Sequence, residues 1–359
     1  MTATRQMADS MPGGVRSGVR GFSAKLSVPP TTTAAMTPPP ATLDFGPGLD
    51  LAARSLASFS ALHPLENQDN LVLIDGTGRA RVLRDQAEHA LHVAHWPSGH
   101  ARVAVLDGMG GHGHGREAAE AAAQAIVQMP ACATLAQLCE RLDALHAQLQ
   151  RQFSAAGERE RRPGTTLTLL ELRPGLAPLL YHVGDSRLYE ITAHRARPLT
   201  IDHVPATTFA LHGLLGPQEW WQQVHEEHRP HIAQAFMLGN AFAPQQRLED
   251  GLLALDADCL PPFLRTLADR RALEVRADAL YLLATDGFWA CQRPQDWTAC
   301  WPALLGRAAT CADALAALFA TLIAAPPPGL HADNLTAIAL RFTDAAGAVN
   351  LDETALPTS

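Results

Sequence analysis

Short apolar runs and segments of helical periodicity alternate along the chain. Strands are predicted at His100–Asp107, Thr165–Leu172, Leu280–Ala284 and Leu335–Phe342. A Gly-Asp-Ser turn between two apolar arms predicts a hairpin at Pro178–Thr192. Apolar residues at helical spacing predict helices at Arg116–Met129, Leu135 to about Ala156, and Ala312–Ala325.

The order of these elements predicts the fold class. Helices come in pairs between runs of strands, and a regular strand–helix–strand alternation is absent. This pattern favours an α+β fold with antiparallel sheets over a doubly wound parallel sheet. Residues 204–279 read less clearly, with Trp220, Trp221 and several histidines and prolines. We expect helices and loops there, forming a flap or side lobe in which the two tryptophans pack.

Composition sets the boundaries of the folded part. Residues 1–50 are rich in Ala, Thr, Pro, Gly and Ser, and such a segment buries too little apolar surface to offset its ordering entropy. We therefore expect a flexible arm at 1–50, a folded domain at 51–342 and a polar tail at 343–359. The chain is 47% hydrophobic over 359 residues, which is ample for a packed core.

Charge and cysteine spacing exclude several function classes. The net charge of −8 is opposite to that of a non-specific nucleic-acid binder. The six cysteines form no C-x-x-C pair, so neither a zinc knuckle nor a redox dithiol is indicated. The first residues contain no apolar stretch of signal-peptide length, and no run is long enough to span a bilayer. The sequence predicts a cytoplasmic protein with no membrane and no nucleic-acid partner.

Five aspartates stand at predicted strand ends or in short turns. They are Asp69 in Glu-Asn-Gln-Asp-Asn, Asp107 in Asp-Gly-Met-Gly-Gly-His, Asp185 in Gly-Asp-Ser-Arg, Asp286 in Ala-Thr-Asp-Gly and Asp333 in Ala-Asp-Asn. A sandwich can bring such strand ends together, and carboxylates gathered at one edge repel each other unless a cation lies between them. Oxygen ligation with few histidines favours Mg²⁺ or Mn²⁺ over zinc.

Two alternatives compete for these residues. Asp-Gly is a common turn dipeptide, so any one of the aspartates taken alone is better explained by a turn or a cap. The glycines after Asp107 resemble a phosphate-binding loop, but they match neither phosphate-loop pattern and no lysine is near. They suit a backbone that comes close to a metal, with the Gly108 carbonyl as a ligand.

The order of the sequence blocks resembles that of the metal-dependent PPM serine/threonine phosphatases, the type 2C-like class, in their bacterial form. The blocks are ENQD, VLDGMGGHGHGREAA, GTTLTLL, YHVGDSRLYEIT, LTIDH, LLATDGFW and ADNLTAIAL. They cover about residues 60 to 342. The resemblance implies two packed antiparallel sheets flanked by helix pairs, with the metal site at one end of the sandwich.

The resemblance also implies a role for each aspartate. Asp107 would bridge two Mn²⁺ or Mg²⁺ ions, with the Gly108 carbonyl on the first ion and Asp286 and Asp333 on the second. Asp185 would join a weaker third-metal site. Asp69 would orient a metal-bound water, with Asn67 and Gln68 beside it, and Asn334 would support Asp333. A water bridging the ions would lose its proton and attack phosphorus in line.

Two positions depart from the family pattern. Many members carry a phosphate-clamping arginine where this chain has Pro64. His63, Arg54 or Arg84 could take its place. Some members carry a histidine directly after the Asp-Gly, where this chain has Met109. His112 could then serve as the general acid for the leaving group, although a purely structural loop role also suits it.

The sequence therefore predicts a Mn²⁺/Mg²⁺-dependent phosphoserine/phosphothreonine phosphatase. Its partners would be phosphoproteins and a cognate kinase of bacterial type. A pseudophosphatase that binds phosphoproteins without turnover is the alternative, because the clamping arginine is absent. A phosphomonoesterase for small molecules on the same scaffold is a third option.

Overall fold

The computed structural model describes residues 42–57, 66–109, 115–154, 163–229, 231–237, 239–240 and 251–343. These residues belong to one compact unit, which begins at Thr42. His63, Pro64, His112, most of the predicted arm and nearly all of the predicted tail lie outside the described residues. None of the helices in the described ranges is both long enough and apolar enough to cross a membrane.

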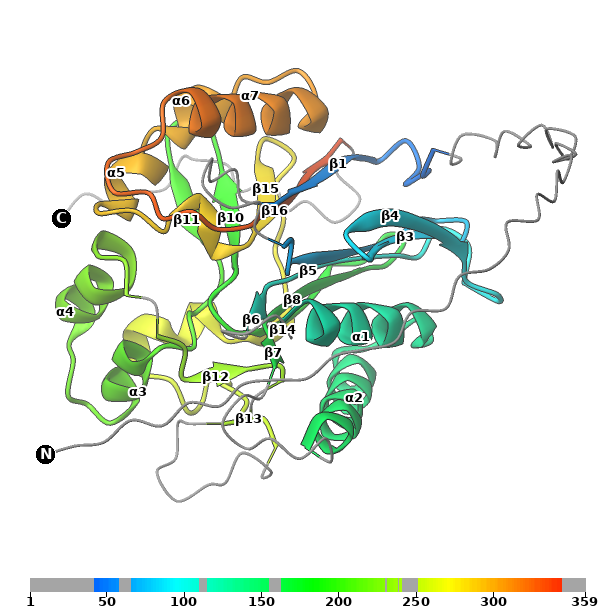
Figure 1. Ribbon diagram of the computed structural model, residues 1–359, viewed down its shortest axis with the longest axis horizontal. Helices are drawn as coiled ribbons and strands as arrows, with labels where there is room; N and C mark the ends of the chain where they lie inside the picture. Colours follow the sequence, from blue (N-terminus) through cyan, green and yellow to red (C-terminus); the bar gives the residue numbers. More distant parts are fainter. Residues whose placement is uncertain are drawn as a thin grey trace, which may run out of the picture. The chain divides into compact units, whose positions relative to one another are not determined.

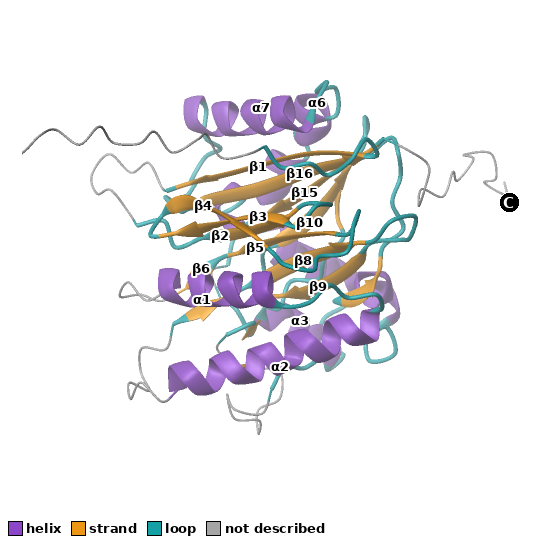
Figure 2. Ribbon diagram, turned by 90° about the vertical axis from the view of Figure 1, so that its right-hand side faces the viewer, coloured by secondary structure: helices purple, strands orange, loops and turns teal. Residues whose placement is uncertain are grey.

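Two antiparallel sheets stack on each other in this unit (Figure 2). In spatial order, the five-stranded sheet consists of β1 (Leu49–Leu56), β16 (Leu335–Phe342), β15 (Leu280–Ala284), β10 (Arg187–Ile191) and β11 (Ala196–Pro198). The seven-stranded sheet consists of β14 (Arg270–Ala272), β9 (Leu179–Val183), β8 (Leu167–Leu172), β5 (Ala101–Leu106), β2 (Asn70–Ile74), β3 (Arg79–Arg84) and β4 (Ala87–His92). A short ribbon pairs β6 (Gly108–Met109) with β7 (Gly164–Thr165).

Helices cover the outer face of each sheet (Figure 1). The seven-stranded sheet is covered by α1 (Gly115–Gln128) and α2 (Leu135–Ser154). The five-stranded sheet is covered by α5 (Pro294–Thr298), α6 (Trp301–Leu305) and α7 (Cys311–Ala324). A short 3-10 turn, η3 (Asp286–Phe288), follows β15.

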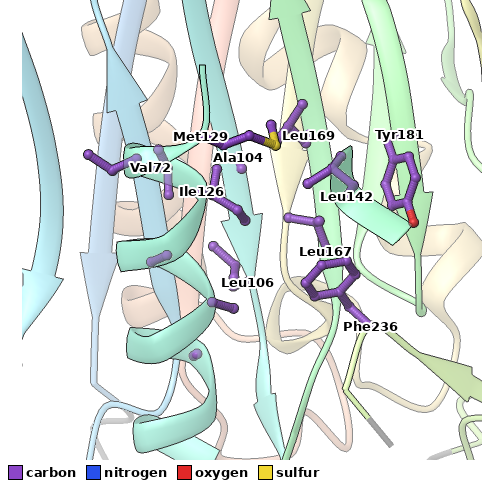
Figure 3. Packing of buried hydrophobic residues seen from close by; sticks show 14 of the residues in the cluster. Val72, Ala104, Leu106, Ile126, Met129, Leu142, Leu167, Leu169, Tyr181 and Phe236 are labelled. Atoms are coloured by element: carbon purple, nitrogen blue, oxygen red, sulfur yellow. The ribbon is translucent and has the colours of Figure 1, made fainter. Parts of the chain in front are cut away.

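The central strands are buried along their whole length because both of their faces are covered. Along β5, Val103 and Val105 point into the core between the sheets, while Ala104 and Leu106 pack toward the helices. Figure 3 shows Ile126 of α1 beside the sheet residues Ala104 and Leu106. The alternation of side chains along a strand thus divides each apolar run between two cores.

A side lobe lies beside the sandwich and carries a small core of its own. It contains α3 (Pro205–Leu211), α4 (Pro217–Trp221), the π-turn η1 (Gln222–Glu226), β12 (Gln234–Ala235), β13 (Gly239–Asn240) and the 3-10 turn η2 (Pro262–Leu267). Trp220 is 2% exposed in the centre of this core, and Trp221 packs against it. Both tryptophans therefore pack within the lobe, as expected.

Most predicted elements are present, and the differences have physical causes. The predicted strand Thr165–Leu172 is split at Thr166, which separates β7 from β8. The arm prediction is wrong at its end, because β1 begins at Leu49 and pairs with β16. Strands β2, β3 and β4 were not predicted. The exposed outer strand β4 and the arginine-rich β3 lack the apolar run that identifies a doubly covered strand.

Candidate active site

Strand register places the predicted aspartates at one end of the sandwich. Asn70 of β2 pairs with Leu106 of β5, so Asp69, which precedes β2, and Asp107, which follows β5, lie at the same end. In the other sheet, Ala284 pairs with Arg187 on one side and with Ala337 on the other. The residues just outside these pairs are Asp185, Asp286 and Asp333. Antiparallel pairing thus gathers residues that are far apart in the chain.

The five carboxylates lie close enough to repel one another. Burial raises the pKa of Asp107 well above its ordinary value, and the other four carboxylates add to this rise. Burial, together with the nearby charge of Asp333, raises the pKa of Asp69 to about 8. The same two causes raise the pKa of Asp286 to about 6. The cluster is therefore electrostatically strained in the absence of a positive charge.

Asn334 fixes the Glu-Asn-Gln-Asp segment against the start of β16. Its Oδ1 accepts a hydrogen bond from the Gln68 backbone N–H at 2.8 Å, and its Nδ2 donates to the Glu66 carbonyl at 3.1 Å. Its own backbone N–H donates to Asp333 Oδ1 at 2.8 Å. One asparagine side chain thus ties the segment that carries Asp69 to the one that carries Asp333.

Asp69 is held by hydroxyl groups from the five-stranded sheet. It is 3% exposed, and Thr285 Oγ1 donates to its Oδ2 at 2.9 Å. The Thr336 backbone N–H donates to the same Thr285 hydroxyl at 3.1 Å, so the donor is fixed in orientation. Asn67, two residues before Asp69, donates through Nδ2 to Ser55 Oγ at 2.9 Å, which anchors this segment to β1. Thr285 directly precedes Asp286, but no pattern in the sequence indicated its role.

Thr166 joins the segments of Asp107 and Asp185. Its Oγ1 accepts from the Asp107 backbone N–H at 2.9 Å and shares a hydrogen bond with Ser186 Oγ at 2.8 Å. Gly184 makes this close approach possible, because it has φ +121° and a Cβ there would lie 2.6 Å from the Thr166 side chain. The Gly-Thr-Thr and Gly-Asp-Ser blocks thus meet at a single hydroxyl.

The backbone at Gly108 is enclosed by two other segments. A Cβ on Gly108 would collide with the Gln68 carbonyl and would lie 2.5 Å from the Gly115 carbonyl. Conversely, a Cβ on Gly115 would lie 2.7 Å from the Gly108 carbonyl oxygen. Glycine is therefore required at the point where the Asp107 strand, the Asp69 segment and the start of α1 converge.

Arg187 ties the Asp185 turn to the side lobe. It is 3% exposed and forms a bidentate ion pair with Asp202, whose closest contact is 2.7 Å. Its Nη2 also donates to the carbonyl of Val224 in η1 at 2.7 Å. Its guanidinium lies over the Trp289 ring, 4.8 Å from the centroid. Arg187 is the last residue of the Gly-Asp-Ser-Arg motif, and no pattern in the sequence indicated this role.

The structure places the arginines that could replace the clamping arginine in different surroundings. Arg54 stacks on Phe319 of α7, 4.5 Å from the ring centroid, so its guanidinium lies against the helix layer and not on the aspartate cluster. Arg116, which was not among these candidates, forms ion pairs with Glu66 and Glu120 and so brings a guanidinium to the segment before Asp69. Arg84 is the last residue of β3 and is exposed.

The donor set fits a hard divalent cation. The cluster offers mainly carboxylate oxygens, with the Gly108 backbone next to Asp107 and the imidazole of His331 near Asp333. Within the described residues, no three His, Cys, Asp or Glu side chains already enclose a common point that would hold a metal. Ion binding therefore requires the carboxylates to turn toward each other, and a cation would relieve the repulsion that raises their pKa values.

The raised pKa values predict that the metal-free protein loses stability as the pH rises from 6.5 to 8. In this window the folded protein retains a proton on Asp69 that an unfolded aspartate has released, so the free energy of unfolding falls with pH. The buried His182 and His225, whose pKa values are lowered, oppose this trend near pH 6.5, where unfolded histidines still carry part of their protons, but no longer above about pH 7.5. Urea titrations in EDTA should show a loss of about 1–2 kcal/mol, and saturating Mn²⁺ should remove the slope. A flat or rising profile in EDTA would contradict the clustered arrangement.

Comparisons with known proteins identify the fold. No family model and no curated protein matches the sequence. Among solved structures, the serine/threonine phosphatase of S. agalactiae is 15% identical, with 82% of this chain and 99% of that chain covered at a TM-score of 0.52. Stp1, a serine/threonine phosphatase from Staphylococcus aureus, is 17% identical over 84% and 98% of the two chains at 0.52. PppA, a key regulatory component of T6SS in Pseudomonas aeruginosa, is 18% identical over 82% and 97% at 0.51.

The chain therefore has the fold of the bacterial PPM-type serine/threonine phosphatases. The predicted α+β sandwich of two antiparallel sheets flanked by helices is confirmed. The coverage extends over nearly all of each solved neighbour, so the similarity concerns the whole folded unit.

Proposed function

We propose that this protein is a Mn²⁺- or Mg²⁺-dependent phosphatase that hydrolyses phosphoserine and phosphothreonine in proteins. The observation that supports this proposal is the convergence of five mutually repelling aspartates at one end of a phosphatase-type sandwich. A cluster of this kind is costly to fold and is accounted for if it holds cations.

Each aspartate has a role in the proposed reaction. Asp107, the Gly108 carbonyl, Asp286 and Asp333 would hold two ions, and Asp185 would contribute to a third. When bound, the ions would lower the pKa of a water molecule and neutralise charge on the phosphoryl group.

The other residues of the proposed site would position the attacking water and the leaving group. Asp69 would accept a hydrogen bond from the attacking water, since Thr285 fixes one of its oxygens. Asn67 and Asn334 would position the Asp69 segment through their hydrogen bonds to Ser55, Glu66 and Gln68. His112, outside the described residues, would protonate the leaving oxygen. The natural partners would be phosphoproteins and the kinase that phosphorylates them, in the cytoplasm.

Hydrolysis assays test this proposal. We expect p-nitrophenyl phosphate and a phosphothreonine peptide to be hydrolysed in the presence of Mn²⁺, and to remain intact when EDTA replaces it. Asp107→Asn should lose most of this activity. Asp258→Asn is the matched control, because Asp258 is an exposed aspartate of the lobe and its replacement should leave activity unchanged.

Two other outcomes would favour the competing functions. Tight binding of a phosphopeptide with negligible turnover at saturating Mn²⁺ would identify a pseudophosphatase. Rapid hydrolysis of phosphorylated metabolites with no peptide hydrolysis would identify a small-molecule phosphomonoesterase. Equal hydrolysis with Mn²⁺ and with EDTA would contradict the metal-dependent mechanism.

A further inference from the structure

A cavity of about 200 Å³ opens from the aspartate cluster toward the side lobe. Asp185 and Asp286 form the wall at the cluster end. Because both also belong to the cluster, the cavity is continuous with the proposed site of phosphate hydrolysis. Its volume is below the roughly 300–1,000 Å³ that encloses a drug-sized ligand, so it has room for little more than a side chain.

One wall of the cavity on the lobe side is apolar, while the rest of that side is polar and consists of Gln223, Glu227, His228, Arg229 and His231. Val204, Pro205, Ala206 and Phe209 of α3 and its N-terminal flank form the apolar wall, opposite Trp289 and Pro294 from the five-stranded sheet side. Phe209 is 46% exposed, although phenylalanine is usually buried. Of the large hydrophobic side chains that are exposed in the described residues, Phe209 alone lines this cavity. An exposed aromatic ring at the mouth of a polar site indicates a contact surface for a ligand.

The arginines of the cavity are already bound to acidic partners. Arg187 is bound to Asp202, and Arg229 is bound to Glu227 with a closest distance of 2.6 Å. His228 packs against His331, with ring centroids 5.2 Å apart. An acidic side chain that entered the cavity would therefore find no unpaired guanidinium, and desolvating it would be unfavourable. An apolar side chain would bury its surface against Phe209 and Trp289.

We propose that this cavity binds an apolar side chain next to the phosphorylated residue of the substrate, and that Phe209 determines this preference. This inference rests on the proposed phosphatase function and adds a substrate class to it: phosphoproteins with an apolar residue flanking the phosphoserine or phosphothreonine. The phosphoryl group lies at the aspartate cluster, and the flanking side chain enters the cavity between α3 and Trp289.

A panel of phosphothreonine peptides tests the inference on the full chain with saturating Mn²⁺. The peptides carry Leu, Ser, Lys or Glu at each position from three residues before to three residues after the phosphothreonine. We expect kcat/KM to be about tenfold higher for Leu than for Ser or Glu at one flanking position, which is typical of discrimination by a small apolar pocket. The gain should appear mainly in KM.

Variants locate the preference on the lobe. Phe209→Ala should reduce the ratio of kcat/KM for the Leu peptide to that for the Ser peptide to less than threefold, while Phe209→Leu should retain most of it. Leu214→Ala is the matched control, because Leu214 is 68% exposed in the same lobe and does not line the cavity. Thermal melting checks that each variant is folded.

The outcomes separate this inference from the proposed function. Equal kcat/KM across the panel, a preference for Glu or Lys, or a Leu preference that survives in Phe209→Ala would each overturn the role of the cavity while leaving the phosphatase function intact. Failure of the unaltered protein to hydrolyse p-nitrophenyl phosphate with Mn²⁺ would instead reject the phosphatase function itself.

Discussion

Asp107→Asn is expected to reduce kcat/KM for both p-nitrophenyl phosphate and a phosphothreonine peptide by more than about a hundredfold. Loss of a residue that merely supports a metal ligand typically costs about 10- to 100-fold in activity or metal affinity, and loss of a ligand itself should cost more. Asp107 interacts with all four other carboxylates of the cluster, so its charge is central to cation binding.

The same variant should be more stable than the unaltered protein when metal is removed. Asparagine keeps the two hydrogen bonds that the backbone of residue 107 makes with Thr166. Its N–H donates to the Thr166 hydroxyl and its carbonyl accepts from the Thr166 N–H, so neither bond involves the carboxylate. It removes a carboxyl group that on folding must either keep a buried, repelled charge or take up a proton, so the melting temperature in EDTA at pH 8 should rise. Loss of activity together with a lower melting temperature in EDTA would indicate misfolding and would not support the metal role.

Arg102→Leu should be the most destabilising of the substitutions considered, by about 3–5 kcal/mol. Arg102 is fully buried, and its Nε and Nη2 donate to Glu171 at 2.6 and 2.9 Å. It also donates to the carbonyls of Ile126 and Met129, each at 2.8 Å, at the C-terminal end of α1. The variant would leave the Glu171 charge buried without its main partner and would uncap the helix that covers the seven-stranded sheet.

Urea denaturation of three further variants would test this role. The double variant Arg102→Leu/Glu171→Leu should recover part of the lost stability, because it removes both buried charges. Arg293→Leu is the surface control, since its ion pair with Asp296 involves side chains that are 77% and 61% exposed. That change should have little effect. A loss of less than about 1 kcal/mol in Arg102→Leu would show that the buried pair contributes little.

The sequence predicted most of the strands that are covered on both faces, although it missed the fully buried β2. The run from Leu280 to Ala284 is buried at every position, and its apolar pattern is unambiguous. Strand β4 is mostly exposed and contains alanines, histidines and a glutamate, so no hydrophobic pattern distinguishes it from a loop. Strand β1 was missed for a similar reason, because most of its residues are only half-buried.

The aspartates of the site could be predicted, but the hydrogen bonds that hold them could not. Strand ends and the order of the sequence blocks identified the five carboxylates, and the register brings them together. The hydroxyl groups of Thr166 and Thr285 act on residues distant in sequence, which only the three-dimensional arrangement reveals. Arg102 looked like part of an apolar strand, since a buried arginine paired across strands leaves no local signal.

The pairing of β1 with β16 has a consequence for biosynthesis. Ser55 and Thr336 share a hydrogen bond across 281 positions of the chain, and the two strands pair along their whole length. On the ribosome, β1 would emerge early and would stay unpaired until β16 is translated, near the end of the domain. A nascent chain lacking β16 would expose an unpaired edge of β15, which is a template for aggregation. Because β16 also carries Thr336 beside Thr285 and Asp69, the proposed active site would be completed only when this last strand docks.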